Sequence, residues 1–206
     1  MSAVPADPLR DTRSRILEVF SRLLAGSGYL GVSLDAVAAE TGIRKASLYH
    51  HFPAGKEEMY QAAALAYIGR GSAQVAQALA GATSLEGRLV ELALLHTDPD
   101  SGGPELDQQV YDATRHVSDE TRTVVSTAYM QGMIGPVAGL MQQATQSGEL
   151  VGDPDFLAWS FLHLAQGVAP LPDDVAMPPE HRGPSPDVRS RAEAVVRLFL
   201  DGARAR

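Results

Sequence analysis

The stretch 33–52, SLDAVAAETGIRKASLYHHF, constrains how this chain can fold more than any other part of the sequence. Ser33 can cap a short helix over the first half of this stretch. The apolar side of that helix comprises Leu34, Val37 and Ala38. Gly42 allows the positive φ that a tight turn requires, and a second helix is expected over about residues 44–51. Two short helices joined by such a turn predict a helix-turn-helix.

The second of these helices is expected to bury one side and present the other to solvent. Leu48 and Phe52 lie one turn apart on its inner side. At about 100° per residue, the outward side comprises Ala46 and His50, flanked by Ser47 and Tyr49. Small, basic and aromatic side chains on an outward face suit a helix that enters the major groove of DNA.

The run GIRKASLYHHF, residues 42–52, resembles the recognition helix of tetracycline-repressor-like (TetR-family) regulators, and SLDAVAAET, residues 33–41, resembles their preceding helix. Lys56 resembles a lysine of that family that contacts the DNA backbone. The resemblance covers about residues 10–65, and Arg44 and Ala46 depart from residues often found at those positions. It implies a dimeric, all-helical DNA-binding regulator with a ligand-responsive C-terminal domain.

The charge distribution agrees with DNA binding by the N-terminal part alone. The chain of 206 residues has a formal net charge of −8. Residues 1–60 hold seven basic and seven acidic residues, so the negative charge lies in the remainder. The only lysines, Lys45 and Lys56, lie in the expected DNA-binding region. Because charges are screened over about 8–10 Å at physiological salt, nearby basic residues matter more for phosphate attraction than the total charge.

The rest of the chain reads as helices, which predicts an all-α fold of about nine helices. We expect an N-terminal three-helix helix-turn-helix DNA-binding domain over residues 1–55. A C-terminal helical ligand-binding and dimerisation domain is expected over residues 56–206. An alanine-rich helix from Lys56 to about Ala80 is long enough to join the two.

Glycine and proline suggest where other helices begin, end or bend. Residues 1–9 are expected to form a loose arm, followed by a helix that ends at Gly26 and Gly28. A helix over about residues 118–146 contains Pro136 among several glycines, which predicts a kink. The proline-rich stretch 170–186 is expected to be a long loop.

The two C-terminal helices are expected to form a dimer contact. One begins at Asp153 and is apolar nearly all round, so that it must be covered on several sides. The last helix carries Val188, Ala192, Val195, Val196 and Phe199 at helical spacing. Packed against their copies, these helices would form a four-helix bundle, the twofold contact of a symmetric DNA reader. A core within a single chain is the alternative.

The expected DNA contacts divide into base reading and phosphate binding. Base reading is expected from Lys45, Tyr49 and His50, with Arg44 and Ala46 as helpers. A lysine can donate to guanine O6 and N7, and an alanine methyl group can contact thymine. Phosphate contacts are expected from Ser33, Ser47, His51 and Lys56. A structural role for Tyr49 is the alternative at that position.

An effector site in the C-terminal domain is expected to use aromatic, methionine and histidine side chains. The candidates are Tyr67, His96, Tyr111, Met133, Trp159 and His163. Each also suits an ordinary core, and His163 in its apolar helix suits a hydrogen-bonded core histidine. His96 and Asp98 are too loosely spaced, beside a loop, to argue for a metal or acid–base pair.

No catalytic motif is found in the sequence, which lacks a P-loop and the GxGxxG, GxSxG and HExxH patterns. We therefore expect no enzyme, no catalytic residues, no metal and no cofactor. The absence of cysteine excludes disulfides and thiolate metal sites. Without a long apolar run or a signal pattern, the chain is expected to be cytoplasmic and not membrane-bound.

These features favour a DNA-binding transcriptional regulator. It would be a homodimeric repressor that binds a palindromic double-stranded operator and is released by a small-molecule effector of unknown identity. One alternative is a helical small-molecule-binding protein or enzyme whose N-terminal motif is only structural. Another is a helical dimer that acts only through protein partners. Retention on DNA at low salt separates the first reading from both alternatives.

Overall fold

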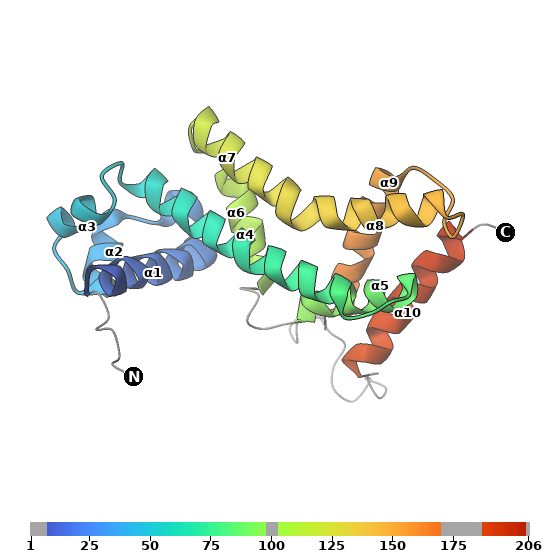
Figure 1. The fold of residues 1–206 in the computed structure, drawn as a ribbon. Coiled ribbons are helices and arrows are strands. Elements are labelled where there is room, and N and C mark those ends of the chain that lie inside the picture. Colours follow the sequence, from blue (N-terminus) through green and yellow to red (C-terminus); the bar gives the residue numbers. More distant parts are fainter. Residues whose placement is uncertain (1–7, 98–102, 170–186, 205–206) are drawn as a thin grey trace, which may run out of the picture. The chain divides into compact units, whose positions relative to one another are not determined.

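The fold of the chain is all-helical wherever the structure describes it (Figure 1). The structure is a computed structural model that describes residues 8–97, 103–169 and 187–204. Across these ranges there is no β-strand, apart from one isolated bridge between Leu150 and Arg204. The expectations for residues 1–7, for the loop 170–186 and for Asp98 lie outside the described residues. The expected all-α class is confirmed.

The chain divides into two compact units. The first comprises residues 1–69 and 102–128, and the second comprises residues 70–101 and 129–206. The first unit thus takes in the expected helix-turn-helix together with a later part of the chain. The functional boundary after residue 55 stays a prediction, since compactness and function need not divide a chain at the same place.

The first unit contains the two helices of the expected helix-turn-helix and the helices that surround them. They are α1 (Pro8–Gly31), α2 (Leu34–Thr41), α3 (Lys45–His51), the first part of α4 (Lys56–Ala80), α6 (Gly103–Ala113) and most of α7 (Asp119–Tyr129). α6 packs along α1, and α2 packs against both α1 and α3. The apolar side chains at the centre of this unit are fully buried and come from three helices, α1, α3 and α4; they are Ile16, Phe20, Leu24, Leu48 and Met59.

The second unit surrounds a core of its own. It contains the rest of α4, α5 (Leu85–Leu94), a π-helical segment (Met130–Ile134), α8 (Gly135–Gln146), α9 (Pro154–Ala165) and α10 (Val188–Ala203). Two 3-10 turns, Leu95–Thr97 and Gln166–Val168, extend α5 and α9. α10 lies along α5, and α9 packs against α8 (Figure 1). Leu89, Met141, Phe161 and Leu200 are among the residues buried where these helices meet.

Two interruptions of the helices differ from the simplest reading of the sequence. α1 continues past Gly26 to Gly31 and leaves helical geometry only at Gly28, where φ is 68°. A Cβ atom at Gly28 would lie 2.8 Å from Oε1 of Gln109, so this kink also depends on a close approach from α6. The expected bend before Pro136 takes the form of the π-helical segment. With α7, that segment and α8 taken as one run, the described residues contain nine helices.

The start of α4 is tied to the start of α7 within the first unit. Ser118 donates to Oε1 of Glu57 from its backbone N–H at 3.0 Å and from its hydroxyl at 2.5 Å. One turn further along α4, the Tyr60 hydroxyl donates to the carbonyl oxygen of Val110 in α6 at 2.7 Å. The hydrogen bonds from Ser118 and Thr121 lower the pKa of Glu57 below its ordinary value. Glu57 is therefore an ionised anchor for the first turn of α4.

Within the described residues, no helix is both long and apolar enough to cross a membrane.

The left-handed backbone of Gly42, with φ of 73°, predicts opposite effects of alanine at two glycines. Gly42→Ala should lower the free energy of unfolding by about 1–2 kcal/mol, because a side chain at this φ is strained. Gly26→Ala, in the helical part of α1 with no atom within 4 Å of the added Cβ, should raise it by about 0.5–1 kcal/mol. Urea unfolding of both variants measures the change in the free energy of unfolding. A change of the same sign and size in the two variants would contradict the prediction.

The lowered pKa of Glu57 predicts a pH-dependent contribution to stability. The stabilisation is present above the unfolded pKa of about 4.3 and is lost as the pH falls through the folded value. Glu57→Gln and Ser118→Ala should each flatten the dependence of unfolding free energy on pH below about pH 5. Denaturant unfolding over a pH series tests this, with Glu120→Gln as a variant of equal net charge. If Glu57→Gln shows the same dependence of unfolding free energy on pH as the wild type, Glu57 does not stabilise the fold in this way.

Candidate nucleic-acid interface

The turn between α2 and α3 follows from local hydrogen bonds. The Ser33 side chain accepts a hydrogen bond from the backbone N–H of Ala36 at 3.1 Å, so it caps α2 as expected. At the other end, Gly42 donates to the carbonyl oxygen of Ala39 at 3.2 Å. Ile43 donates to the carbonyl oxygen of Ala38 at 3.1 Å, which closes the helix in the manner of a left-handed C-cap. The chain then enters α3 directly.

α3 buries one side and exposes the other. Leu48 and, at its C-cap, Phe52 have no exposed surface. The outward positions are exposed to solvent; they are Arg44, Lys45, Ala46, Ser47, Tyr49 and His50. Ser33 is also exposed, whereas His51 and Lys56 are half-buried. The expected base-reading side chains therefore lie on one accessible helix surface, which could face a duplex.

Lys45 is held by an acidic residue that sequence spacing does not single out. Its Nζ lies 3.0 Å from Oδ2 of Asp35, in the first turn of α2. Lys45 and Asp35 retain 48% and 75% of their side-chain exposure, so a ligand could approach both. This pair connects the two helices of the motif across the turn.

Tyr49 combines a packed edge with an exposed one. Its side chain is 46% exposed. Its Cε1 lies 3.5 Å from where a Cβ atom would stand on Gly55, a residue with φ of 72° in the following turn. At that distance a Cβ atom would only be in van der Waals contact with the ring, so the ring lies close to the loop at Gly55 while part of it faces solvent. This placement is compatible with both roles considered for Tyr49.

Lys56 at the start of α4 is positioned by an aromatic platform. Its Nζ lies 4.4 Å from the ring centroid of Tyr29, a cation–π contact. The Tyr29 ring is in turn parallel to the ring of His116, with centroids 6.5 Å apart. Burial lowers the pKa of Lys56. Tyr29 and His116 had no recognisable signal in the sequence, because they come from α1 and from the turn after α6.

Three arginines of α1 have partners within the first unit. The Arg13 guanidinium lies 4.6 Å from the ring centroid of Phe52, and Arg15 donates to the carbonyl oxygen of Thr41. Arg22 forms an ion pair with Glu40 at 2.7 Å. These contacts join α1 to both helices of the motif and bring positive charge close to them.

The expected effector residues lie in varied surroundings. In the first unit, Tyr67 is buried and Tyr111 is 62% exposed. In the second, His96 and Met133 are half-buried, and Met133 packs on Gly71, where a Cβ atom would lie 2.6 Å from its sulfur. The structure brings Trp159 and His163 together on the exposed side of α9, with ring centroids 5.8 Å apart.

His163 is hydrogen-bonded as the core reading expected, although it is not in the core. Its Nδ1 lies 2.7 Å from the carbonyl oxygen of Trp159, one turn earlier in α9. The side chain itself is exposed. The apolar character of the helix predicted cover on several sides, whereas the protomer buries only the side that carries Leu157, Ala158, Phe161 and Ala165.

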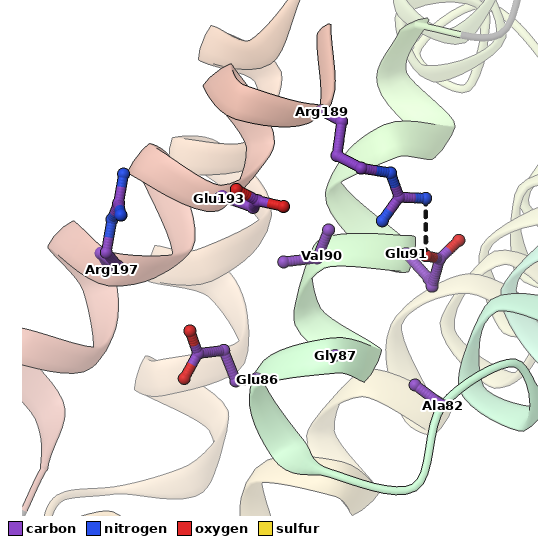
Figure 2. A pocket seen from close by; sticks show the side chains of 8 residues that line it. All are labelled: Ala82, Glu86, Gly87, Val90, Glu91, Arg189, Glu193 and Arg197. Atoms are coloured by element: carbon purple, nitrogen blue, oxygen red, sulfur yellow. Dashed lines mark hydrogen bonds and ion pairs between the residues drawn. The ribbon is translucent and has the colours of Figure 1, made fainter.

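A shallow hollow in the second unit lies between α5 and α10 (Figure 2). Its volume is about 270 Å³, and none of the six expected effector residues lines it. Its charged lining residues are Glu86, Glu91, Glu193, Arg189 and Arg197. Figure 2 shows Arg189 directed at Glu91, and the two form an ion pair at 3.0 Å. Paired charges and a volume below the roughly 300–1,000 Å³ of small-molecule sites make it a poor effector pocket.

Comparison with known proteins finds a family match in the N-terminal part of the first unit. Residues 16–63 match the family of bacterial regulatory proteins described as the tetR family. The HTH-type transcriptional regulator LmrA of Bacillus subtilis is 45% identical over 49 residues, which cover 24% of this chain and 26% of LmrA. The match thus spans about a quarter of that curated relative, so it carries the N-terminal motif and not the whole protein.

The fold resemblance to solved structures extends over nearly the whole chain. A putative transcriptional regulator from Saccharomonospora viridis, in complex with choline, has a TM-score of 0.71 and 22% identity. That alignment covers 96% of this chain and all of the other. AibR, in complex with isovaleryl coenzyme A and operator DNA, has a TM-score of 0.66 and 23% identity, with 92% and 98% of the chains covered. At these identities the comparison establishes the fold, and the match to the tetR family of bacterial regulatory proteins is confined to residues 16–63.

Proposed function

We propose that this chain is a DNA-binding transcriptional regulator, a homodimeric repressor that binds a palindromic operator and is released by a small-molecule effector. The observation that carries the proposal is the exposed outer surface of α3. Lys45, Tyr49 and His50 lie there, while Leu48 on the opposite side is fully buried. We assign DNA binding to residues 1–55, and effector binding and dimerisation to residues 56–206. We propose no catalytic role.

The division of labour on the surface follows from side-chain chemistry. Lys45, Tyr49 and His50 would contact base edges in the major groove, with Arg44 and Ala46 at the start of α3 as helpers. Phosphates would be bound by Ser33, Ser47, His51 and Lys56. Lys56 stands in the first turn of α4, where free backbone N–H groups also favour an anion. Its contact with the Tyr29 ring restricts the direction in which the ammonium can reach.

Dimerisation is proposed through α9 and α10, because both carry a second apolar surface that the protomer leaves uncovered. On α9 the exposed stripe comprises Phe156, Trp159 and His163, with Phe156 68% exposed. On α10 the corresponding stripe has Val188 and Leu198 exposed, at 38% and 65%, with the half-buried Arg191 and Val195 between them. The spacing of three and four residues is that of helices that pack nearly parallel to one another. Two copies of each helix would complete a four-helix bundle with twofold symmetry.

Release by an effector would be a shift between two conformations of the dimer. The two copies of α3 must enter successive major grooves, roughly 34–36 Å apart, to bind one face of the duplex. An effector that binds the wrongly spaced conformation about 1–3 kcal/mol more tightly would weaken operator binding by a factor of about 5–150. α4 contributes residues to both compact units and so could transmit the change. The proposed effector contacts remain Tyr67, His96, Tyr111, Met133, Trp159 and His163. Choline and isovaleryl coenzyme A, the ligands in the two similar structures, differ too much from each other to indicate the chemical class of this effector.

Substitution of the two lysines distinguishes base reading from phosphate binding. Lys45→Ala should weaken binding to an operator selected from random DNA by about 1–3 kcal/mol and relax the preference at one base position. Lys56→Ala should weaken binding to all DNA alike and reduce the slope of log K against log salt concentration by about one. Fluorescence anisotropy titrations over a range of salt concentrations measure both effects. Wild-type operator affinity in both variants would contradict the assignment.

Interruption of the proposed dimer contact should change the oligomeric state. Leu198→Glu places a carboxylate at the centre of the exposed stripe of α10, so the dimer should dissociate at micromolar concentrations. Gln142→Glu, on an exposed position of α8, adds the same charge elsewhere and should leave the dimer intact. Sedimentation velocity measures both. A dimer that survives in Leu198→Glu would place the contact on another surface.

A further inference from the structure

The ion pair between α2 and α3 suggests a role for Asp35 that goes beyond the contacts proposed above. We infer that Asp35 is a specificity-determining residue: its carboxylate holds the Lys45 ammonium over the base-reading surface and competes with DNA phosphates for it. The inference rests on the proposed DNA-binding function. It concerns how much better the operator binds than other DNA, and not whether DNA binds at all.

The geometry leaves Lys45 able to read a base while it remains paired. Nζ of Lys45 lies 3.0 Å from Oδ2 of Asp35, and a lysine ammonium has three N–H donors. One donor is used by the carboxylate, and the others stay available to the O6 and N7 acceptors of guanine. Asp35 is itself fixed in the first turn of α2, where the helix dipole favours a negative charge. The pair therefore limits the directions in which the flexible lysine can point.

The same carboxylate opposes binding to DNA of the wrong sequence. A lysine is a compact charge on a flexible stem, and away from its operator it would pair with any nearby phosphate. With Asp35 present, such a phosphate must displace the carboxylate, which is then left unpaired in the negative potential of the duplex. A correctly placed guanine needs no displacement. Asp35 thus weakens non-specific binding more than specific binding, an example of specificity gained through a repulsive group.

A second ion pair on the same helix supplies a matched control. Glu40, at the other end of α2, pairs with Arg22 of α1 at 2.7 Å. Its side chain is 37% exposed. Glu40→Gln removes the same charge from the same helix as Asp35→Asn, without changing the environment of Lys45. A general effect of net charge on DNA affinity should therefore appear equally in both variants.

The experiment compares operator and non-operator DNA in anisotropy titrations at several salt concentrations. Asp35→Asn should raise the affinity for non-operator DNA roughly two- to fivefold, the range expected for loss of an exposed ion pair. The operator affinity should rise less, so the ratio of the two affinities should fall. The slope of log K against log salt concentration for non-operator DNA should steepen by up to about one, because Lys45 becomes free to contact a phosphate. Glu40→Gln should keep the wild-type ratio.

Two further variants test whether Asp35 acts through Lys45. In a Lys45→Met background, Asp35→Asn should leave the affinity ratio unchanged, because the coupling between the two residues has been removed. Asp35→Glu, which keeps the charge, should preserve the wild-type ratio. Thermal unfolding of each variant shows that the first unit is folded before its affinities are compared.

The outcomes separate this inference from the function on which it rests. If the wild-type protein binds its operator but Asp35→Asn has a wild-type ratio, the role of Asp35 is refuted and DNA binding stands. If Glu40→Gln lowers the ratio of operator to non-operator affinity as much as Asp35→Asn does, the effect is one of net charge and the inference is wrong. If Asp35→Asn lowers this ratio equally in the Lys45→Met background, Asp35 does not act through Lys45 and the inference is also wrong. If the wild-type protein retains no DNA at low salt, the proposed function and this inference both fail.

Discussion

The complete burial of Leu48 and Phe52 determines which side of α3 faces solvent. α3 has only seven residues, fewer than the roughly 12–15 at which an isolated helix becomes even marginally stable in water. Its helical form therefore depends on these two side chains packing into the first unit. Gly42 and Gly55, both with positive φ, bracket α3 and allow the chain to enter and leave it abruptly. The outward direction of Lys45, Tyr49 and His50 is a consequence of that packing.

The parts of the fold that the sequence predicts well are those set by neighbouring residues. The side chains of Ser33 and Asp153 each accept a hydrogen bond from the backbone N–H three residues later, so the local sequence contains both partners. The length of α1 was less predictable. Gly26 is tolerated within the helix, and the kink occurs at Gly28, close to Gln109 of α6. That residue is distant in the sequence, so no local pattern indicated which glycine would bend the helix.

The candidate site shows the same distinction. Helical periodicity was enough to predict the exposed side of α3. It could not predict that Lys45 pairs with Asp35, that Lys56 rests on Tyr29 or that Arg13 covers Phe52, because each contact joins different helices. The apolar composition of α9 likewise did not reveal which side the protomer would cover. Trp159 and His163 are exposed, which suits a contact with another chain at least as well as a small-molecule pocket.

The unequal sides of α3 also bear on how such a protein can change over generations. Arg44, Ala46 and Ser47 are exposed and lie outside the hydrophobic core, so replacing them leaves that core intact. Gly42, Leu48 and Phe52 have no such freedom, because backbone geometry or close packing restricts what each can become. Under the proposed function, descendants of a duplicated gene would acquire new DNA targets through a few exchanges on one helix surface, while inheriting the framework that presents it.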